Sequence, residues 1–498
     1  MAASDLVHTL LDEAAAQAPG NCAVRDADAS VTYRELVDLS WAFAAWLREQ
    51  GVGRGDRLVV QLPSRHELVA MFLGAVRLGV VFVPLNKDMR EFHQRAVLAD
   101  SEPSLVIAAG EAAAKLSGLT EVPVHDATTL WPAIVAAAGT ALQLPAEVAP
   151  DDVATLVYTS GSTALPKAVI CPHRQMTFAS RSIHQVLGYR PTDVVFCRFP
   201  ISWDYGLYKI LLCFLGRSTL VLAGEESDLA LLSRMREVGA TVVPIVPSLA
   251  TMIVTLSERD TAAKPPVRMF TNTGAALPDS TIAALRENFP GTRVVRQFGQ
   301  TECKRVSIVP PDEDGLRPTS VGLPLPGTRV LILDSEGQPV PTGEVGEIVV
   351  TGPHVMPGYW RLPELTAQTF RPDPATGEKR LHTGDYGSLD SDGYLYFEGR
   401  RDDMFKRKGI RMSTLEIEAA ALDIAGVRAA AVLPPTAERD LVIFVESTLE
   451  PHTVLKELAQ RLDKAKVPAI CRVVGELPLT AHGKNAREAL NAILTGAA

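Results

Sequence analysis

A run of small and hydroxylic residues followed by a proline–lysine pair is the first feature of this sequence that could perform chemistry. The run extends from Thr159 to Thr163, and the pair is Pro166 and Lys167. Successive small residues let backbone N–H groups converge on an anion, and the lysine adds a point charge suited to phosphate. A Walker-type loop is disfavoured, because Ala168 follows the lysine where that loop has Ser or Thr. The stretch predicts a phosphate-binding loop of another kind, with an ordinary polar loop as the alternative.

A glycine turn at residues 297–302, with the sequence Gln-Phe-Gly-Gln-Thr-Glu, brings an aromatic ring, a hydroxyl and a carboxylate together. Phe298 offers a ring on which adenine can stack, and Thr301 can bond a phosphate. Glu302 can hold a Mg²⁺ that bridges phosphates, since Mg²⁺ takes oxygen ligands and few protein groups. The alternative interpretation is a loop with a solvated glutamate.

Four further segments hold short motifs of small or polar residues. Residues 270–278 read as a strand followed by Gly274 and two alanines, and Asp385 follows a His-Thr-Gly triplet. Residues 399–411 are a charge-rich run, which taken alone is typical of a solvated linker. Lys484 follows a glycine near the C-terminal end, and taken alone it is an exposed lysine. Each segment by itself has an ordinary structural explanation, so only the combination of all of them predicts a function.

In this order and spacing, the segments resemble the motifs of the adenylate-forming superfamily, which contains acyl-CoA synthetases, adenylation domains of nonribosomal peptide synthetases and firefly-type luciferases. The resemblance spans about residues 6–490, and its most specific part is the run at 399–411. The chain has Ala164 and Ala168 where the family usually has glycine, which restricts the loop backbone, and Phe298 where the family has tyrosine. The resemblance implies that ATP contacts Thr159, Ser160, Gly161, Ser162, Thr163, Lys167, Gly274, Ala275, Ala276, Gln297, Phe298, Gly299, Thr301, Glu302, Asp385, Arg400 and Lys484.

The resemblance also implies a two-step reaction. A substrate carboxylate attacks the α-phosphate of ATP and pyrophosphate leaves, with Lys484, Glu302 and Thr159 as catalytic residues and Mg²⁺ held by Glu302. The protein contributes positioning and charge stabilisation. A C-terminal domain then turns about a hinge at Asp402 and admits a thiol past Gly409. The thiol takes the acyl group, giving a thioester and AMP.

The acid substrate is expected to lie against residues 199–208. Amino-acid-activating members of the superfamily place an Asp at the position of Asp204 to pair with the α-ammonium, and a carboxylate in a pocket is costly unless it is paired. This favours an amino substrate, while a structural Asp204 and a cyclic or aromatic acid without an amine remain open. Arg305 could recognise an anionic group or pair with Asp204. The other expected lining residues are Trp203, Tyr205, Tyr208, Thr271, Thr273 and Gln297.

The acceptor thiol is expected to arrive in trans, on CoA or on the phosphopantetheine of a separate carrier protein. The few residues after Arg487 are too short for a carrier domain, and no condensation-like segment precedes Leu6. A carrier protein is favoured through the similarity to stand-alone adenylating enzymes of natural-product pathways. The alternatives are a conventional acyl-CoA synthetase for a non-amino acid and an adenylating enzyme that leaves thioesterification to another protein.

Two other classes of protein are alternatives to the ligase. A luciferase-like oxidase would need a chromophoric substrate, for which the sequence gives no sign. A non-catalytic nucleotide-binding relative is suggested by Ala164 and Ala168. Retention of Lys484, Glu302 and Asp385 argues against that interpretation.

Composition and net charge indicate the cellular location of the protein and the classes of partner that it is expected to lack. The 498 residues carry a net charge of −9, which gives no reason to expect nucleic acid or an anionic membrane as a partner. Six cysteines without a C-x-x-C pair suggest neither zinc nor a disulfide framework. Apolar windows at 68–85 and 210–223 are interrupted by Arg77 and Arg217, and no signal peptide is evident at the start. A cytoplasmic protein is expected.

The elements that must position these residues follow an α/β pattern. Alternating strands and helices through about residue 325 predict parallel sheets covered by helices. Turn-rich residues 329–350 predict a small antiparallel barrel or sheet, and a short α+β segment follows residue 401. We therefore expect an N-terminal core at 1–401, with its β-rich subdomain at about 326–400, and a small mobile C-terminal domain at 402–498. Residues 119–152 are expected to be a surface connection. Strands are expected at 57–62, 80–85, 104–109, 154–157, 193–198, 218–222, 241–246, 268–271 and 293–296.

Overall fold

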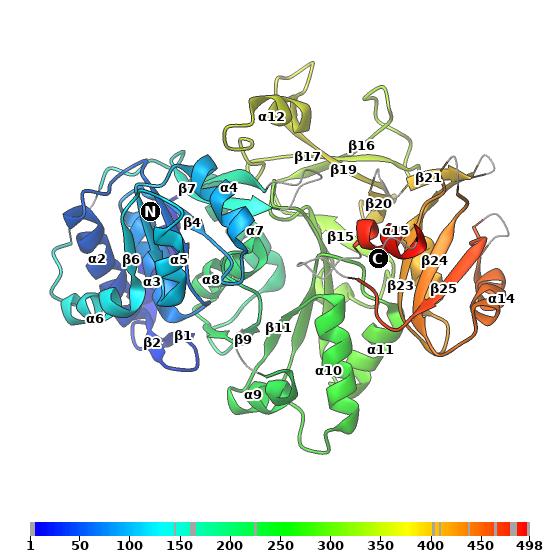
Figure 1. Cartoon of the computed structure of the whole chain (residues 1–498), viewed down its shortest axis with the longest axis horizontal. Helices are drawn as coiled ribbons and strands as arrows, with labels where there is room; N and C mark the ends of the chain where they lie inside the picture. Colours follow the sequence, from blue (N-terminus) through cyan, green and yellow to red (C-terminus); the bar gives the residue numbers. More distant parts are fainter. Residues whose placement is uncertain are drawn as a thin grey trace.

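The computed structural model describes residues 5–143, 146–159, 166–223, 227–400, 404–407, 410–436, 439–462, 466–478 and 486–495. Figure 1 shows a mixed α/β molecule, with a six-stranded sheet among the blue and cyan elements and a longer sheet running through the green and yellow ones. A three-stranded sheet lies among the orange and red elements near the C-terminal end. The α/β class predicted from sequence is confirmed.

The six-stranded sheet has the order β6-β5-β3-β4-β7-β8. Its strands are parallel except for the last pair, β7 and β8, which is antiparallel. The predicted phosphate loop therefore joins two antiparallel neighbours rather than a strand and a helix. The strands are β3 (Arg57–Gln61), β4 (Val81–Pro84), β5 (Leu105–Ala108), β6 (Val124–Asp126), β7 (Val153–Thr159) and β8 (Lys167–Pro172).

The longer sheet has the order β16-β17-β19-β20-β15-β14-β13-β12-β11-β9-β10-β1-β2. It is parallel from β13 to β1 and antiparallel from β13 to β16, so the expected β-rich segment continues the parallel half through β14. Its strands are β1 (Cys22–Arg25), β2 (Ser30–Thr32), β9 (Val194–Cys197), β10 (Thr219–Leu222), β11 (Val242–Ile245), β12 (Met269–Asn272), β13 (Arg293–Phe298), β14 (Ser307–Ile308), β15 (Ser320–Pro324), β16 (Arg329–Leu333), β17 (Gly346–Thr351), β18 (Phe370–Pro372), β19 (Lys379–Leu389) and β20 (Leu395–Arg400).

Most helices of this part pack with the sheets in one large apolar core, while α4 and α5 pack on the six-stranded sheet in a second, smaller cluster. Nearly every residue of α3 and of α8 is buried, because both segments are predominantly apolar around the helix. Helix α2 begins after Thr32, whose hydroxyl accepts from the backbone of Glu35 in a reciprocal capping box. The helices are α1 (Val7–Gln17), α2 (Tyr33–Glu49), α3 (His66–Arg77), α4 (Glu91–Ser101), α5 (Glu111–Ser117), α6 (Ala127–Ala137), α7 (His173–Leu187), α8 (Asp204–Gly216), α9 (Leu231–Glu237), α10 (Pro247–Arg259), α11 (Asp279–Asn288) and α12 (Pro363–Thr369), with single 3₁₀ turns at Asp228–Ala230 and Pro311–Glu313.

The C-terminal segment has apolar clusters of its own, centred on the sheet β23-β24-β25. This sheet and α14 lie at the opposite end of Figure 1 from the six-stranded sheet. The boundary at residue 402 and the mobility of this segment stay predictions. The elements are β21 (Met404–Arg407), β22 (Ile410–Ser413), α13 (Thr414–Leu422), β23 (Val427–Leu433), β24 (Val442–Ser447), α14 (Pro451–Arg461), β25 (Ile470–Val474) and α15 (Arg487–Thr495).

One prediction about the fold is wrong: residues 119–152 are not a plain surface connection. They contain edge strand β6 and helix α6, whose first turn is capped by the carboxylate of Asp126. Helix α6 holds Pro132 in its interior and buries Leu130 and Ile134. The proline obscured the helical pattern, and tertiary burial outweighs the hydrogen bond that a helix loses at proline. Among the described residues, no helix has the length and apolar character needed to cross a membrane.

Candidate active site

Lys167, Glu302 and Tyr359 meet where the six-stranded sheet approaches the loop after β13. The Nζ of Lys167 lies 3.3 Å from Oε1 of Glu302 and donates to the Tyr359 hydroxyl at 2.9 Å. That hydroxyl donates to the same Glu302 oxygen at 2.7 Å. Two residues predicted from separate motifs are thus in contact, which supports placing phosphates and their metal here.

The loop after β13 carries the glutamate because its chain turns back sharply at Gly299. A Cβ at that position would meet the Cα of Arg305 and the carbonyl oxygen of Lys304, each at 2.7 Å. Only glycine allows this close approach of two backbone segments. The turn therefore fixes Glu302 on one side and Lys304 and Arg305 on the other.

The residues predicted to hold adenine and ribose lie on β12, β13, β19 and β20 or on the turns that follow them. Asp385 of β19 is buried, and its Oδ1 lies 3.3 Å from Nε of the half-exposed Arg400 on β20. The Phe298 ring packs on Phe397 with centroids 5.1 Å apart. The adenine segment from Gly274 to Ala276 is an exposed turn directly after β12.

The predicted acid-binding residues form a second cluster, beyond the carboxyl ends of the parallel strands, where open α/β sheets place their ligands. Asp204 begins α8, and its Oδ2 lies 2.9 Å from Nζ of Lys304. The guanidinium of Arg305 donates to the hydroxyl of Thr273 at 2.9 Å. The alternative that Arg305 pairs with Asp204 is therefore corrected: the ion-pair partner of Asp204 is the neighbouring Lys304.

Two tyrosines of α8 support the cations of this cluster. The ammonium of Lys304 lies 4.1 Å from the centre of the Tyr208 ring, and that of Lys209 lies 4.3 Å from the centre of the Tyr205 ring. The Tyr205 hydroxyl is fixed by donating to the carbonyl oxygen of Thr271 at 2.6 Å. Such cation–π contacts are strongest when the cation is desolvated, as it is here.

The electrostatics of the cluster are unusual for a protein interior. Burial by itself raises the pKa of Asp204, but the ammonium of Lys304 holds that pKa below its ordinary value. Burial lowers the pKa of Lys304 to about 8, even with the carboxylate beside it. Burial and the charge of Arg305 lower the pKa of Lys209 to about 7. Perturbed groups gathered in one place mark a candidate functional site.

Polar atoms without a hydrogen-bond partner concentrate around the same cluster. Within the described part of the chain, both amide atoms of buried Gln297 lack a partner, as do the Tyr208 hydroxyl and Nε of Arg305. Buried polar groups are nearly always hydrogen-bonded, so a group of exceptions calls for an explanation. A polar ligand at this cluster would provide one. Further atoms of this kind belong to Ser202, Asn272 and Gln300.

Three of these residues were missed by the sequence reasoning: Lys304, Tyr359 and Lys209. A signal existed for Lys304, which lies two residues beyond the Glu302 motif. Its backbone φ of 67° is in the left-handed region, a strain that non-glycine residues seldom carry outside functional sites. No local signal distinguishes Tyr359 or Lys209.

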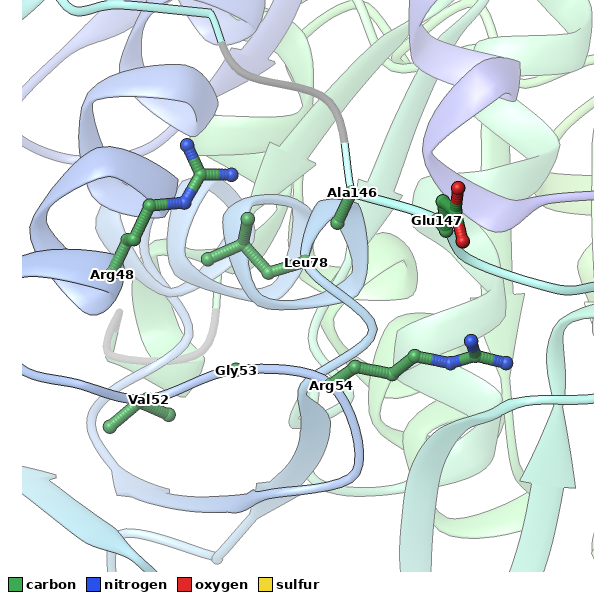
Figure 2. Close-up of a pocket in the computed structure, with 7 residues that line it drawn as sticks. All are labelled: Arg48, Val52, Gly53, Arg54, Leu78, Ala146 and Glu147. Carbon is green, nitrogen blue, oxygen red and sulfur yellow. The ribbon is translucent and has the colours of Figure 1, made fainter.

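Several predicted residues cannot be placed. Ser160, Gly161, Ser162, Thr163, Asp402, Gly409 and Lys484 lie outside the residues that the structure describes. Figure 2 shows an open pocket lined by Arg48, Arg54, Leu78 and Glu147 among others, and no residue predicted for the site lines it. Arg54 is paired there with Asp152 at 2.7 Å. We therefore treat this pocket as separate from the active site.

The residues present fit a magnesium ion accompanying ATP. Glu302 is buried and supplies a hard carboxylate, the ligand type that Mg²⁺ prefers. Its neighbours are a lysine and a phenol rather than thiols or imidazoles, which are the ligands of softer metals.

Comparison with known proteins gives related curated sequences. Delta-poly-L-ornithine synthetase of Acinetobacter baumannii is 30% identical over 95% of this chain, but the chain spans only 36% of that relative. The 4-hydroxybenzoate–CoA/benzoate–CoA ligase of Rhodopseudomonas palustris is 30% identical over 96% of this chain and 92% of the ligase.

Solved structures extend the comparison. VinN in complex with L-aspartate is 54% identical with a TM-score of 0.74, covering 79% of this chain and 98% of VinN. ATP-bound MatB from Rhodopseudomonas palustris is 26% identical with a TM-score of 0.89, covering 99% of both chains. The AMP-binding enzyme family matches residues 11–360, well over half of the chain. The protein thus belongs to the AMP-binding enzyme family, a class of AMP-forming ligases.

Proposed function

We propose that this ligase activates an amino acid carrying a second carboxylate, such as aspartate or a 3-substituted aspartate. The substrate's reacting carboxylate attacks the α-phosphate of ATP, pyrophosphate leaves, and an acyl-adenylate results. The observation that carries the proposal is the cluster of partly exposed Asp204 with buried Lys304 and Arg305. The similarity to VinN, solved with L-aspartate and with 3-methylaspartate, supports it.

The cluster suits such a substrate because it offers charges of both signs. Asp204 keeps 23% of its side-chain surface exposed, so an ammonium group can reach it from the open side. Lys304 and Arg305 are both buried and together exceed the single charge of Asp204. A second carboxylate on the substrate would compensate that excess, since a buried charge is tolerated when it is paired.

The nucleotide side has separate tasks. Lys167 binds phosphate oxygens, Asp385 accepts from the ribose hydroxyls, and Arg400 contacts the nucleotide. Magnesium held by Glu302 would supply charge neutralisation of the phosphates. Lys484 bonds the reacting carboxylate and the α-phosphate, in keeping with the motif in which it lies. These roles orient an in-line attack and require no covalent enzyme intermediate.

The test is ATP–pyrophosphate exchange with aspartate and two analogues that each lack one of its charged groups. Aspartate carries both groups, succinate lacks the ammonium, and β-alanine lacks the second carboxylate. We expect aspartate or 3-methylaspartate to exceed each of the others by about 100-fold in kcat/KM, because a buried charge left unpaired costs several kcal/mol. Equal rates with succinate would refute the amino substrate, and equal rates with β-alanine would refute the role of the second carboxylate. A benzoate-type acid as best substrate would favour a conventional acyl-CoA synthetase.

For the second step we propose a carrier-protein phosphopantetheine as the acceptor thiol, in preference to free CoA. The similarity to nonribosomal synthetases favours this choice. The experiment compares turnover with a cognate holo-carrier protein and with CoA at equal concentration. Efficient acyl-CoA formation without transfer to a carrier would reverse the choice, and thioester formation with neither would leave the enzyme as an adenylating protein alone.

A further inference from the structure

Tyr359 connects the two charged residues of the nucleotide side although no motif contains it. Its hydroxyl accepts from Lys167 at 2.9 Å and donates to Oε1 of Glu302 at 2.7 Å. The Lys167 ammonium also lies 4.1 Å from the centre of its ring. The side chain is therefore held between a cation and an anion that were both assigned to ATP.

The backbone around Tyr359 is hydrogen-bonded to β8, the strand that carries Lys167, and to the backbone of Glu302. The carbonyl oxygen of Gly358 accepts from Ile170 at 3.0 Å, and Trp360 donates to the carbonyl oxygen of Ala168 at 2.9 Å, so this segment runs beside β8. Met356 donates to the carbonyl oxygen of Glu302 at 2.9 Å. The hydroxyl is thus carried by a segment that is tied to both sides and cannot shift independently of them.

The distances show what the hydroxyl does. A lysine and a carboxylate in a charge-assisted hydrogen bond usually approach to about 2.7–2.9 Å, whereas the ion pair between Lys167 and Glu302 is longer, at 3.3 Å. The carboxylate oxygen that faces the ammonium already accepts from the phenol.

We propose that Tyr359 is a positioning residue that keeps the ion pair between Lys167 and Glu302 long, because its hydroxyl occupies the carboxylate oxygen that faces the ammonium. Glu302 then stays available to the metal of MgATP, and Lys167 to the phosphates. The inference rests on the proposed nucleotide site but not on the identity of the acid. Without the hydroxyl, the ammonium would approach the carboxylate more closely, and the metal would have to compete with a stronger ion pair for Glu302.

The test measures ATP affinity by calorimetry over a range of Mg²⁺ concentrations, without any acid substrate. In Tyr359→Phe we expect the Mg²⁺ concentration for half-maximal ATP affinity to rise about tenfold, from loss of one hydrogen bond to a charged group. An unchanged Mg²⁺ requirement overturns the inference. If the wild-type protein itself shows no effect of Mg²⁺ on ATP binding, the proposed metal site fails instead.

Tyr394→Phe is the matched control. The Tyr394 hydroxyl donates to Glu313, and the guanidinium of Arg317 lies 4.1 Å from the centre of its ring, so the contacts are alike but involve no predicted site residue. We expect its Mg²⁺ requirement to equal that of the wild type, and a rise like that of Tyr359→Phe would mean a general loss of stability and overturn the inference.

A double variant tests the separation itself. In the Lys167→Met background there is no ammonium to pair with Glu302, so adding Tyr359→Phe should leave the Mg²⁺ requirement unchanged within about twofold. A tenfold rise in that background as well would show that the hydroxyl acts on Glu302 alone, and would overturn the proposed role. Melting temperatures of all variants, measured in parallel, identify any that do not fold.

Discussion

The nucleotide side and the acid side of the site are built on the same turn but differ in charge balance. On the nucleotide side, Lys167 and Glu302 neutralise each other and share a tyrosine hydroxyl. On the acid side, two buried cations, Lys304 and Arg305, face the single carboxylate of Asp204, which pairs with Lys304, and buried Lys209 lies nearby. Because the Mg²⁺ of MgATP compensates part of the charge of the phosphates, the nucleotide side can be neutral before the nucleotide binds. The acid side carries excess positive charge that is balanced only when an anionic substrate binds.

The strongest test of this comparison removes the buried ammonium. Lys304→Met should lower kcat/KM for aspartate about 1,000-fold, because it also leaves Asp204 buried without its partner. The dissociation constant for MgATP should stay within about twofold of the wild type. Pyrophosphate exchange and calorimetry measure the two quantities. A comparable loss of ATP affinity would show that the two sides are a single electrostatic unit.

Replacing the carboxylate gives a smaller and more selective effect. Asp204→Ala should raise KM for aspartate about 100-fold and that for succinate much less, because only aspartate carries the ammonium. Steady-state kinetics with both acids check this. Equal effects on the two acids would make Asp204 a structural partner of Lys304 and point to a substrate without an amine.

The turn at Gly299 positions residues of both the nucleotide side and the acid side, so changing it should affect both substrates. Gly299→Ala places a methyl group 2.7 Å from the backbone of Lys304 and Arg305, so the turn must shift. We expect KM for ATP and for the acid each to rise about tenfold, together with a lower melting temperature. Kinetics at fixed concentrations of either substrate distinguish the effects. An effect confined to one substrate would show that the turn positions only that side.

The pH dependence should also separate the two sides. The pKa of Lys304 is lowered to about 8, so its charge is complete below that pH and is lost as the pH rises through it. We expect kcat/KM for aspartate to fall about tenfold per pH unit above pH 8, while ATP affinity stays constant from pH 7 to 9. Lys304→Arg should remove the decline, because guanidinium remains charged. A decline that persists in this variant would assign it to another group.

The smallest effect concerns stability away from the site. His8 and His173 are buried neutral, and burial lowers their pKa values to about 4 and about 3. Between those values and 6.5 the unfolded chain binds more protons, so stability falls as the pH drops through this window and is complete above it. In His8→Leu, the unfolding free energy should decline less steeply as the pH falls, because about one proton fewer is taken up on unfolding. Urea unfolding at several pH values measures this slope. An unchanged slope would refute the buried neutral state of His8.

Sequence reasoning predicted the α/β class and most of the strands, because these depend on local patterns, and the nucleotide roles that it assigned stay predictions. The strands of both sheets follow short apolar runs, and the Glu302 motif combines its ring, hydroxyl and carboxylate within six residues. Helix α6 was missed because Pro132 lies inside it, and its burial depends on packing rather than local preference. Asp204 was identified by resemblance, and Lys304, rather than the alternative partner Arg305 one residue away, forms the ion pair with it.

The sequence by itself determined the chemistry available at each motif: small residues and hydroxyls for phosphate, a carboxylate for magnesium, and acidic Asp204 for an ammonium. Tertiary structure alone decided which groups meet. Lys304 reaches Asp204 across a separation of 100 residues, and Tyr359 reaches Lys167 across 192. These contacts arise from strand order and from the sharp turn at Gly299, which bring the ends of distant segments together. A charge balance of this kind depends on distances and burial, which no local sequence pattern records.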